Sequence, residues 1–339
     1  MIRCVNEGEN GMTERIPAID IGPFLAGDPA GKADVADAVR RACEEIGFLV
    51  ISGHGVPRET TEVLFERGFA FYDLPAEIKN RWHPTGDAKQ RGYHGMATRG
   101  LSATLGKDAP KDLRESVFLG PLDDHSAAYA HIPEARTVYA PNLIPDQPPG
   151  VDAALTGMYR AYERLAADLL RIFAVALEMP EDHFAPLIGK HFSVLSAHHY
   201  PALTEPPLPG QLRTGEHTDY GALTILATTE ARGGLEARRA DGVWLQVAPG
   251  PGELVVNLGD MMQRWTNDRW VSTMHRVAVP ENLNDAMSRR MSVGYFMHPN
   301  YDAEVRCIPT CLRRGEAAEY APITAGGHIR AKIEASHKG

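Results

Sequence analysis

The stretch GEHTDYGALTIL (215–226) decides how this chain is interpreted, because it joins a His-x-Asp pair to strand-forming residues. Successive side chains of a β-strand point to opposite faces, so residues two apart share a face. We therefore expect His217 and Asp219 to lie on one strand and point into one cavity. A His-x-Asp pair alone is more often a surface polar pairing than a metal site, so the flanking sequence has to decide between these hypotheses.

Two further motifs downstream favour the metal site. The strand-like run VSTMHRVAV (271–279) carries His275, far enough along the chain to cross a sheet and return. Two imidazoles and one carboxylate are the donor set of a facial iron(II) site with open positions, and the lack of nearby thiolates argues against structural zinc. Arg290-Met-Ser292 follows. An arginine and a hydroxyl are suited to hold a carboxylate, such as that of 2-oxoglutarate, so the motifs indicate an oxygen-activating enzyme.

In order and spacing, these motifs resemble the catalytic core of the iron(II)/2-oxoglutarate-dependent dioxygenases. The resemblance is closest to the subfamily of isopenicillin N synthase, aminocyclopropane carboxylate oxidase and the plant flavonoid and gibberellin dioxygenases. The matching stretches are IPAIDIGPFL (16–25), RRACEEIGFLVISGHGVP (40–57), HHYPAL (198–203), GEHTDYGALTIL (215–226), GELVVNLGDMMQRWTND (252–268), VSTMHRV (271–277) and RRMSVGYFMHPNYD (289–302).

The resemblance implies a mostly β fold with flanking helices, built around a double-stranded β-helix, or jelly roll. It also implies Fe(II), 2-oxoglutarate and O2 as cofactor and cosubstrates, with succinate and CO2 released. Hydroxylation would be the default outcome, and desaturation or ring closure would use the same chemistry. The residues that the resemblance assigns are the iron ligands His217, Asp219 and His275, and the residues gripping the distal carboxylate of 2-oxoglutarate, Arg290, Ser292 and Tyr200.

The chain departs from the family pattern at two places. His198 stands two residues before Tyr200, where plant members usually carry asparagine. The segment PENLNDAMS (280–288) lengthens the turn between His275 and Arg290 and is rich in turn-forming residues. The metal motif is intact. Because of His198, however, the substrate of a plant enzyme cannot be assigned to this chain.

The substrate pocket can be predicted only from strand alternation and nearby loops. Counting by twos from Arg290 reaches Phe296, and His198 shares a face with Tyr200. Core packing is an equally good hypothesis for Phe296. Several arginines suggest an acidic small molecule. The candidate substrate residues are Phe296, His198, Arg91, Tyr93 and Arg213, with the strand 115–120 beside them.

Composition fits an ordinary globular enzyme of 339 residues, with 43% apolar and 23% charged residues. A net charge of −9 makes nucleic acid or an anionic membrane a poor partner. The first residues contain acids and no apolar run, so we expect no secretory signal and a cytoplasmic protein with reduced thiols. We expect residues 1–14 to be a disordered lead and 15–339 a single catalytic domain, with an amino-terminal dioxygenase region at 15–130 and the jelly-roll core at 191–300.

Periodicity predicts the order of elements. Asn257 and Asp260 are expected to be turn formers. The predicted elements are a strand over 16–25, a helix over 34–47, a buried strand over 48–55, a helix over 57–73, long loops over 83–150 with a strand at 115–120, an amphipathic helix over 151–178, and strands from 191 onward.

Three alternative functions stay open. One is an oxidase that takes all four electrons from its substrate without 2-oxoglutarate, as isopenicillin N synthase does; succinate release would separate the two. Another is a jelly-roll sensor or binding protein that has lost turnover. The last is a hydrolase using a zinc-bound water, for which Glu216 has the wrong strand parity to act as base.

Overall fold

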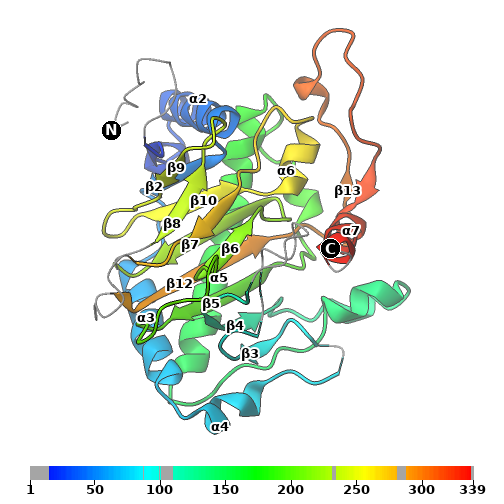
Figure 1. Cartoon of the computed structure of the whole chain (residues 1–339). Coiled ribbons are helices and arrows are strands. Elements are labelled where there is room, and N and C mark those ends of the chain that lie inside the picture. Colours follow the sequence, from blue (N-terminus) through cyan, green and yellow to red (C-terminus); the bar gives the residue numbers. More distant parts are fainter. Residues whose placement is uncertain are drawn as a thin grey trace.

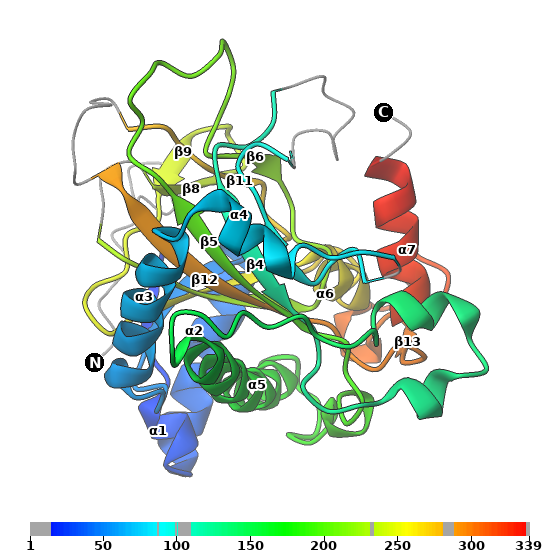
Figure 2. The same cartoon turned by 90° about the horizontal axis from the view of Figure 1, so that it is seen from below.

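Two β-sheets face each other, and helices cover the outer face of the larger sheet (Figures 1 and 2). The computed structural model describes residues 15–86, 88–98, 100, 110–230, 234–280 and 288–336, so the predicted lead over 1–14 lies outside the described residues. The helices in this part of the chain are α1 (Gly22–Leu25), α2 (Pro29–Glu45), α3 (Arg58–Tyr72), α4 (Ala76–Lys79), α5 (Val151–Ala176), α6 (Asp260–Trp265) and α7 (Ala325–Ser336).

The larger sheet has eight strands in the order β1-β2-β10-β7-β12-β5-β4-β3, and the smaller has the order β6-β11-β8-β9. A short pair, β13 with β14, stands apart from both. The strands are β1 (Ala18–Asp20), β2 (Phe48–Ser52), β3 (Gly92–His94), β4 (Glu115–Leu119), β5 (Val194–Tyr200), β6 (Thr214–His217), β7 (Leu223–Thr228), β8 (Leu235–Arg238), β9 (Trp244–Gln246), β10 (Leu254–Leu258), β11 (His275–Val277), β12 (Arg290–Met297), β13 (Glu304–Val305) and β14 (Ile323–Thr324). This is the predicted jelly roll with flanking helices.

The amino-terminal elements follow local sequence signals. The Asp28 side chain accepts a hydrogen bond from the Gly31 amide at 2.9 Å and caps α2, so this helix begins before the predicted residue 34. The prediction of one strand over 16–25 is wrong beyond Asp20. Pro23 lies in the first turn of α1, where its missing amide costs no hydrogen bond.

The longest described helix, α5, lies under the larger sheet beside α2 and α3 (Figure 2). Its apolar face recurs at helical spacing through Leu155, Met158, Tyr162, Leu165 and Leu169, all at most 2% exposed. The predicted helix over 151–178 is confirmed. Across the described residues, each helix is either too short or too polar to cross a lipid bilayer.

The region 83–150 is mostly loop, as predicted, and β4 confirms the strand expected at 115–120. The short strand β3 and two 3₁₀ helices, at Ser126–Tyr129 and Pro133–Thr137, were not predicted. Both β3 and β4 extend the larger sheet beyond β5, so this amino-terminal region forms one wall of the space between the sheets.

Candidate active site

His217 and His275 lie side by side on two neighbouring strands of the smaller sheet. His217 ends β6 and His275 begins β11, and the two residues are directly paired across these antiparallel strands. Their ring centroids are 4.2 Å apart. Asp219 lies in the turn after β6 rather than on the strand, so the expectation of a shared strand is wrong for it. The turn nevertheless brings its carboxylate to the two rings.

The three potential donor atoms point at one another. Asp219 Oδ1 is 3.7 Å from His217 Nε2 and 3.8 Å from His275 Nε2. Each ring donates its other nitrogen, Nδ1–H, to a backbone carbonyl: His217 to Gly215 at 2.8 Å and His275 to Thr273 at 2.9 Å. Because these bonds fix the tautomer, both Nε2 lone pairs are directed into the space between the rings, as in metal sites with supported histidines.

Asp219 is held just as firmly. Its Oδ2 accepts hydrogen bonds from Thr224 Oγ1 at 2.6 Å and Asn257 Nδ2 at 2.7 Å, which leaves Oδ1 facing the histidines. Asn257 lies within β10, so its prediction as a turn former is wrong. The Asp260 amide, at the start of α6, donates to the Asp219 carbonyl at 2.7 Å. Side chain and backbone of Asp219 are therefore both fixed.

Electrostatics favour a cation between these groups. Burial, reinforced by His275, lowers the pKa of His217 to about 3, so its ring is neutral at physiological pH. Burial alone would raise the pKa of Asp219, but His275, His217 and the hydrogen bonds from Thr224 and Asn257 bring it below its usual value. Imidazole nitrogens and an ionised carboxylate are suitable ligands for a divalent iron ion.

Arg290, Ser292 and Tyr200 lie together on the larger sheet. Arg290 pairs with Tyr200 across β12 and β5, and its guanidinium carbon lies 5.0 Å from the Tyr200 ring centroid. Arg290 is 2% exposed; its Nη2 donates to Thr228 Oγ1, while Nη1 has no hydrogen-bond partner among the described residues. Burial lowers the pKa of Arg290. An unpaired buried guanidinium is costly, so this position suits an anionic ligand.

A cavity of about 240 Å³ between the sheets joins the two groups. Its wall includes two of the predicted substrate residues, Phe296 and His198. It also includes the predicted iron ligands and 2-oxoglutarate residues: His217, Asp219, His275, Arg290, Ser292 and Tyr200. Phe296 lies opposite Val194 and Thr224 across neighbouring strands, and those two also line the cavity.

The other three predicted substrate residues do not line the cavity. Arg91 is 1% exposed and donates to the carbonyls of Gln90 and Val138. Tyr93 pairs with Val117 across β3 and β4, and both side chains belong to the core on the helix side of the sheet. The Tyr93 hydroxyl donates to Glu115 at 2.5 Å. Arg213 is fully buried behind the wall.

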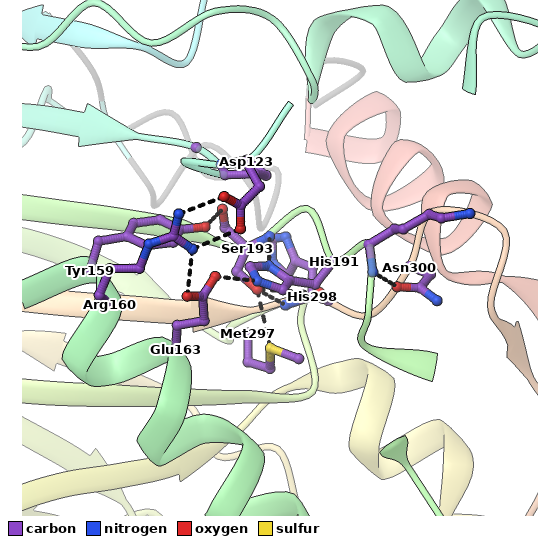
Figure 3. Close-up of polar contacts among 12 residues, drawn as sticks. Asp123, Tyr159, Arg160, Glu163, His191, Ser193, Met297, His298 and Asn300 are labelled. Atoms are coloured by element: carbon purple, nitrogen blue, oxygen red, sulfur yellow. Dashed lines mark hydrogen bonds and ion pairs between the residues drawn. The ribbon is translucent and has the colours of Figure 1, made fainter. Parts of the chain in front are cut away.

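Sequence reasoning missed Arg114, which lines the cavity at the entry to β4. Its alternation with Ser116 and Phe118 was the available signal. His298 also lines the cavity, and Figure 3 shows how its surroundings are supported from α5. The His298 amide donates to Ser193 Oγ at 3.1 Å, and Tyr159 on α5 donates to the Ser193 carbonyl at 3.2 Å (Figure 3).

The same close-up shows a chain of charged groups that ties α5 to the segment before β5. Glu163 is bonded to His191 Nε2 at 2.8 Å and accepts from Arg160 at 2.8 Å (Figure 3). Arg160 also binds both carboxylate oxygens of Asp123, at 2.6 and 2.8 Å. The helix layer thus holds the segment before β5 and the segment after β12 in place.

Two imidazoles and one carboxylate converging on a jelly roll are the donor set of mononuclear non-haem iron enzymes. Comparisons with known proteins narrow this class. Residues 16–147 match the amino-terminal domain of the non-haem dioxygenases in morphine synthesis, and residues 191–299 match the 2OG-Fe(II) oxygenase superfamily. The chain belongs to the iron(II)- and 2-oxoglutarate-dependent oxygenases.

Named relatives span nearly the whole chain. The 2-oxoglutarate-Fe(II) type oxidoreductase hxnY of Emericella nidulans is 32% identical over 95% of this chain and 90% of its own length. The proline hydroxylase buaE of Petromyces alliaceus is 33% identical over 90% of this chain and 94% of its own. A full-length Neurospora crassa protein, solved in complex with alpha-KG (2-oxoglutarate) and thymine, is 28% identical, with a TM-score of 0.83 covering 98% of this chain and 99% of the Neurospora chain.

The protein is therefore an enzyme that uses Fe(II), 2-oxoglutarate and O2 to oxidise a small molecule, releasing succinate and CO2. These relatives favour this function over a four-electron oxidase that dispenses with 2-oxoglutarate and over a non-enzymatic binding protein.

Proposed function

We propose that His217 and His275 bind iron through Nε2 and that Asp219 binds it through Oδ1. One observation carries this assignment: the donor atoms of the three residues all lie within 4.8 Å of one another, and every remaining polar atom of their side chains is already hydrogen-bonded. Three protein ligands leave open positions for cosubstrate and oxygen.

We assign the distal carboxylate of 2-oxoglutarate to Arg290, with Ser292 and Tyr200 beside it. Nη1 of Arg290 has no partner among the described residues. The planar fork of a guanidinium matches a carboxylate better than the ammonium group of a lysine does. Tyr200 is oriented by the contact of its hydroxyl with Thr214 Oγ1 at 3.1 Å. Burial of this group of residues excludes water and strengthens each charge-assisted hydrogen bond.

When bound, iron with 2-oxoglutarate and O2 supplies the oxidising power that removes hydrogen from a substrate carbon, with hydroxylation as the default outcome. The chain's own contribution is to position one C–H bond and keep water out. Phe296 and His198, both on the cavity wall, are the residues that we assign to the substrate.

The substrate is a small molecule, and we propose that it is acidic, because the cavity wall carries a second guanidinium besides Arg290. A relative's name, proline hydroxylase, gives an example of a small acid. The net charge of −9 supports a protein that binds neither nucleic acid nor membrane, and we propose a cytoplasmic location. We also propose that residues 15–339 form one catalytic domain, since strands from 18–119 and 194–297 share one sheet.

Iron content and succinate release test the proposal together. Wild-type protein loaded anaerobically with Fe(II) should hold one ion per chain, and His275→Ala should lose most of it, because three ligands leave no redundancy. His131→Ala, at an exposed position outside the cavity wall, is the matched control and should keep its iron. Full iron occupancy in His275→Ala would show that His275 is not a ligand. A wild-type protein that releases no succinate with any substrate would contradict 2-oxoglutarate dependence.

A further inference from the structure

Arg114 is the cavity residue that the assignments above leave without a role. Its side chain is 9% exposed, and it lines the cavity next to Phe118 and His198. Among the described residues of the cavity wall, the arginine and carboxylate side chains are Arg114, Arg290 and Asp219. Arg290 is assigned to the cosubstrate and Asp219 to iron, so one cation remains.

The guanidinium of Arg114 is held in a fixed place. Its Nη2 lies 3.2 Å from Asp112 Oδ2, and Asp112, itself 2% exposed, accepts a hydrogen bond from the Gly215 amide at 2.9 Å through Oδ1. Gly215 lies on β6, two residues before His217. Asp112 therefore ties Arg114 to the strand that carries a proposed iron ligand.

His198 fixes the other side of the guanidinium. Its ring nitrogens are hydrogen-bonded to Ser116 Oγ at 2.7 Å and Ser196 Oγ at 2.8 Å, and Arg114 Nη1 lies 3.2 Å from Nε2. A guanidinium has five N–H donors, and these contacts occupy a minority of them. The remaining donors are available to a ligand in the cavity.

Strand register separates Arg114 from the cosubstrate residues. Glu115 pairs with His199 across β4 and β5, so Arg114 is level with Tyr200, which pairs with Arg290 on β12. Two strand spacings, about 10 Å, therefore lie between the two arginines along the sheet.

We propose that Arg114 binds a carboxylate of the substrate and thereby sets which carbon faces the metal, an inference that rests on the proposed function of the cavity. The two arginines then bind different anions: Arg290 binds the distal carboxylate of the cosubstrate, and Arg114 binds the carboxylate of the substrate. A carboxylate can approach the planar fork with two parallel hydrogen bonds, which fixes its orientation as well as its position. The competing role is structural, in which Arg114 only joins β4 to β6 through Asp112.

Matched acid and amide pairs test the proposal: benzoate and benzamide, nicotinate and nicotinamide, L-proline and L-prolinamide. Binding of each compound to the protein loaded anaerobically with Fe(II) and 2-oxoglutarate is measured by calorimetry, and stimulation of succinate release is measured in air. Wild type should bind at least one acid about tenfold or more tightly than its amide. Arg114→Gln should abolish that preference, and Arg114→Lys should retain part of it.

Arg306→Gln is the control, since this exposed arginine pairs with Glu304 and lies outside the cavity wall. In Arg114→Gln, iron content and 2-oxoglutarate affinity should stay at wild-type values. A fall in 2-oxoglutarate affinity instead would move Arg114 to the cosubstrate site, and a lower melting temperature with an unchanged acid preference would leave it a structural role. Both outcomes overturn the proposal, as does a wild type that binds no acid better than its amide. Failure of wild type to bind iron or 2-oxoglutarate contradicts the proposed function itself.

Discussion

Arg290 is the first residue of β12, and Arg289 directly precedes it, but the two side chains have opposite surroundings. Arg289 faces the helix side: it donates to Asp73 at 2.7 Å and to His199 Nε2 at 2.9 Å, and its guanidinium lies over the Phe69 ring. Arg290 faces the cavity with a free Nη1. Neighbouring side chains of an extended chain point to opposite faces, which accounts for this division.

The pair gives a matched experiment on cosubstrate binding. Arg290→Ala should weaken 2-oxoglutarate binding about tenfold or more, because a hydrogen bond to a charged group is worth about 1.5–3 kcal/mol. Iron binding should stay nearly intact. Arg289→Ala removes the same side chain from the other face and should leave 2-oxoglutarate affinity unchanged. Anaerobic titration of the iron-loaded proteins measures both, and equal affinities in the two variants would dismiss Arg290 as the carboxylate anchor.

Phe296 has two possible roles, contact with the substrate in the pocket or packing in the core, and one variant can distinguish them. It lines the cavity and is only partly buried, which favours the pocket. Phe296→Ala should stay folded and iron-loaded and still consume 2-oxoglutarate, yet form product poorly, because a misplacement near 1 Å can cost about a hundredfold in rate. Succinate-to-product ratio and melting temperature are measured on one preparation.

Phe173→Ala on α5 provides the contrast, since Phe173 is fully buried in the main core. It should lose about 3–5 kcal/mol of stability and keep normal coupling in the folded fraction. Should Phe296→Ala behave in the same way, its ring belongs to the core.

The limits of prediction at this scale have a physical cause. A motif such as His-x-Asp carries its geometry in a few residues, so the convergence of the His217 and Asp219 side chains could be predicted from sequence, although the strand position of Asp219 could not. Asn257 contacts Asp219 across 38 positions through the pairing of β10 with β7, and no local pattern encodes that register. Arg91 and Tyr93 were predicted to lie on a loop that forms the pocket, but β3 turns Tyr93 toward the helices.

At the scale of elements, α6 and α7 together hold the segment that carries Asp219. Lys332 on α7 contacts Asp260 Oδ2 at 2.6 Å, and the same oxygen accepts from Thr218 Oγ1 at 3.1 Å. His328, one turn earlier, donates from Nε2 to the Tyr220 carbonyl at 3.1 Å. Both neighbours of Asp219 are thereby attached to α7, Thr218 through Asp260 and Tyr220 directly.

Removing these attachments should loosen the metal site without unfolding the protein. Lys332→Met together with His328→Ala should release iron several-fold faster, because each contact is partly exposed and worth about 1 kcal/mol or less. Arg330→Met is the control: it lies between them on α7 but pairs with Glu134 and Glu334. Iron release to a chelator is followed for each variant; identical rates would show that α6 alone fixes Asp219.

At the scale of the molecule, the larger sheet separates two apolar clusters with different duties. The main core fills the space between the sheet and α2, α3 and α5, whereas a smaller cluster around Phe48, Val255 and Val277 lies between the sheets. The jelly roll and its helix layer were predictable because long periodic segments and motif order define them. The α1 turn and β3 were not, since three- or four-residue elements depend on what they pack against.

The cavity between the sheets carries polar atoms, such as Arg290 Nη1, with no hydrogen-bond partner among the described residues, so bound ligands should stabilise the whole fold. At 100 times its Kd, a ligand that binds only the folded state adds about 2.7 kcal/mol. Each kcal/mol corresponds to about 2–4 °C in a chain of 150–250 residues, and somewhat less in one of 339. At 100 times its Kd, Fe(II) added anaerobically should therefore raise the melting temperature by about 4 °C, and 2-oxoglutarate should add a further increment that requires the metal. In His275→Ala both increments should vanish, while Arg290→Ala should keep the first and lose most of the second. Scanning fluorimetry of the three proteins, with each ligand alone and together, measures the increments separately; a 2-oxoglutarate shift of full size in Arg290→Ala would place the distal carboxylate elsewhere in the cavity.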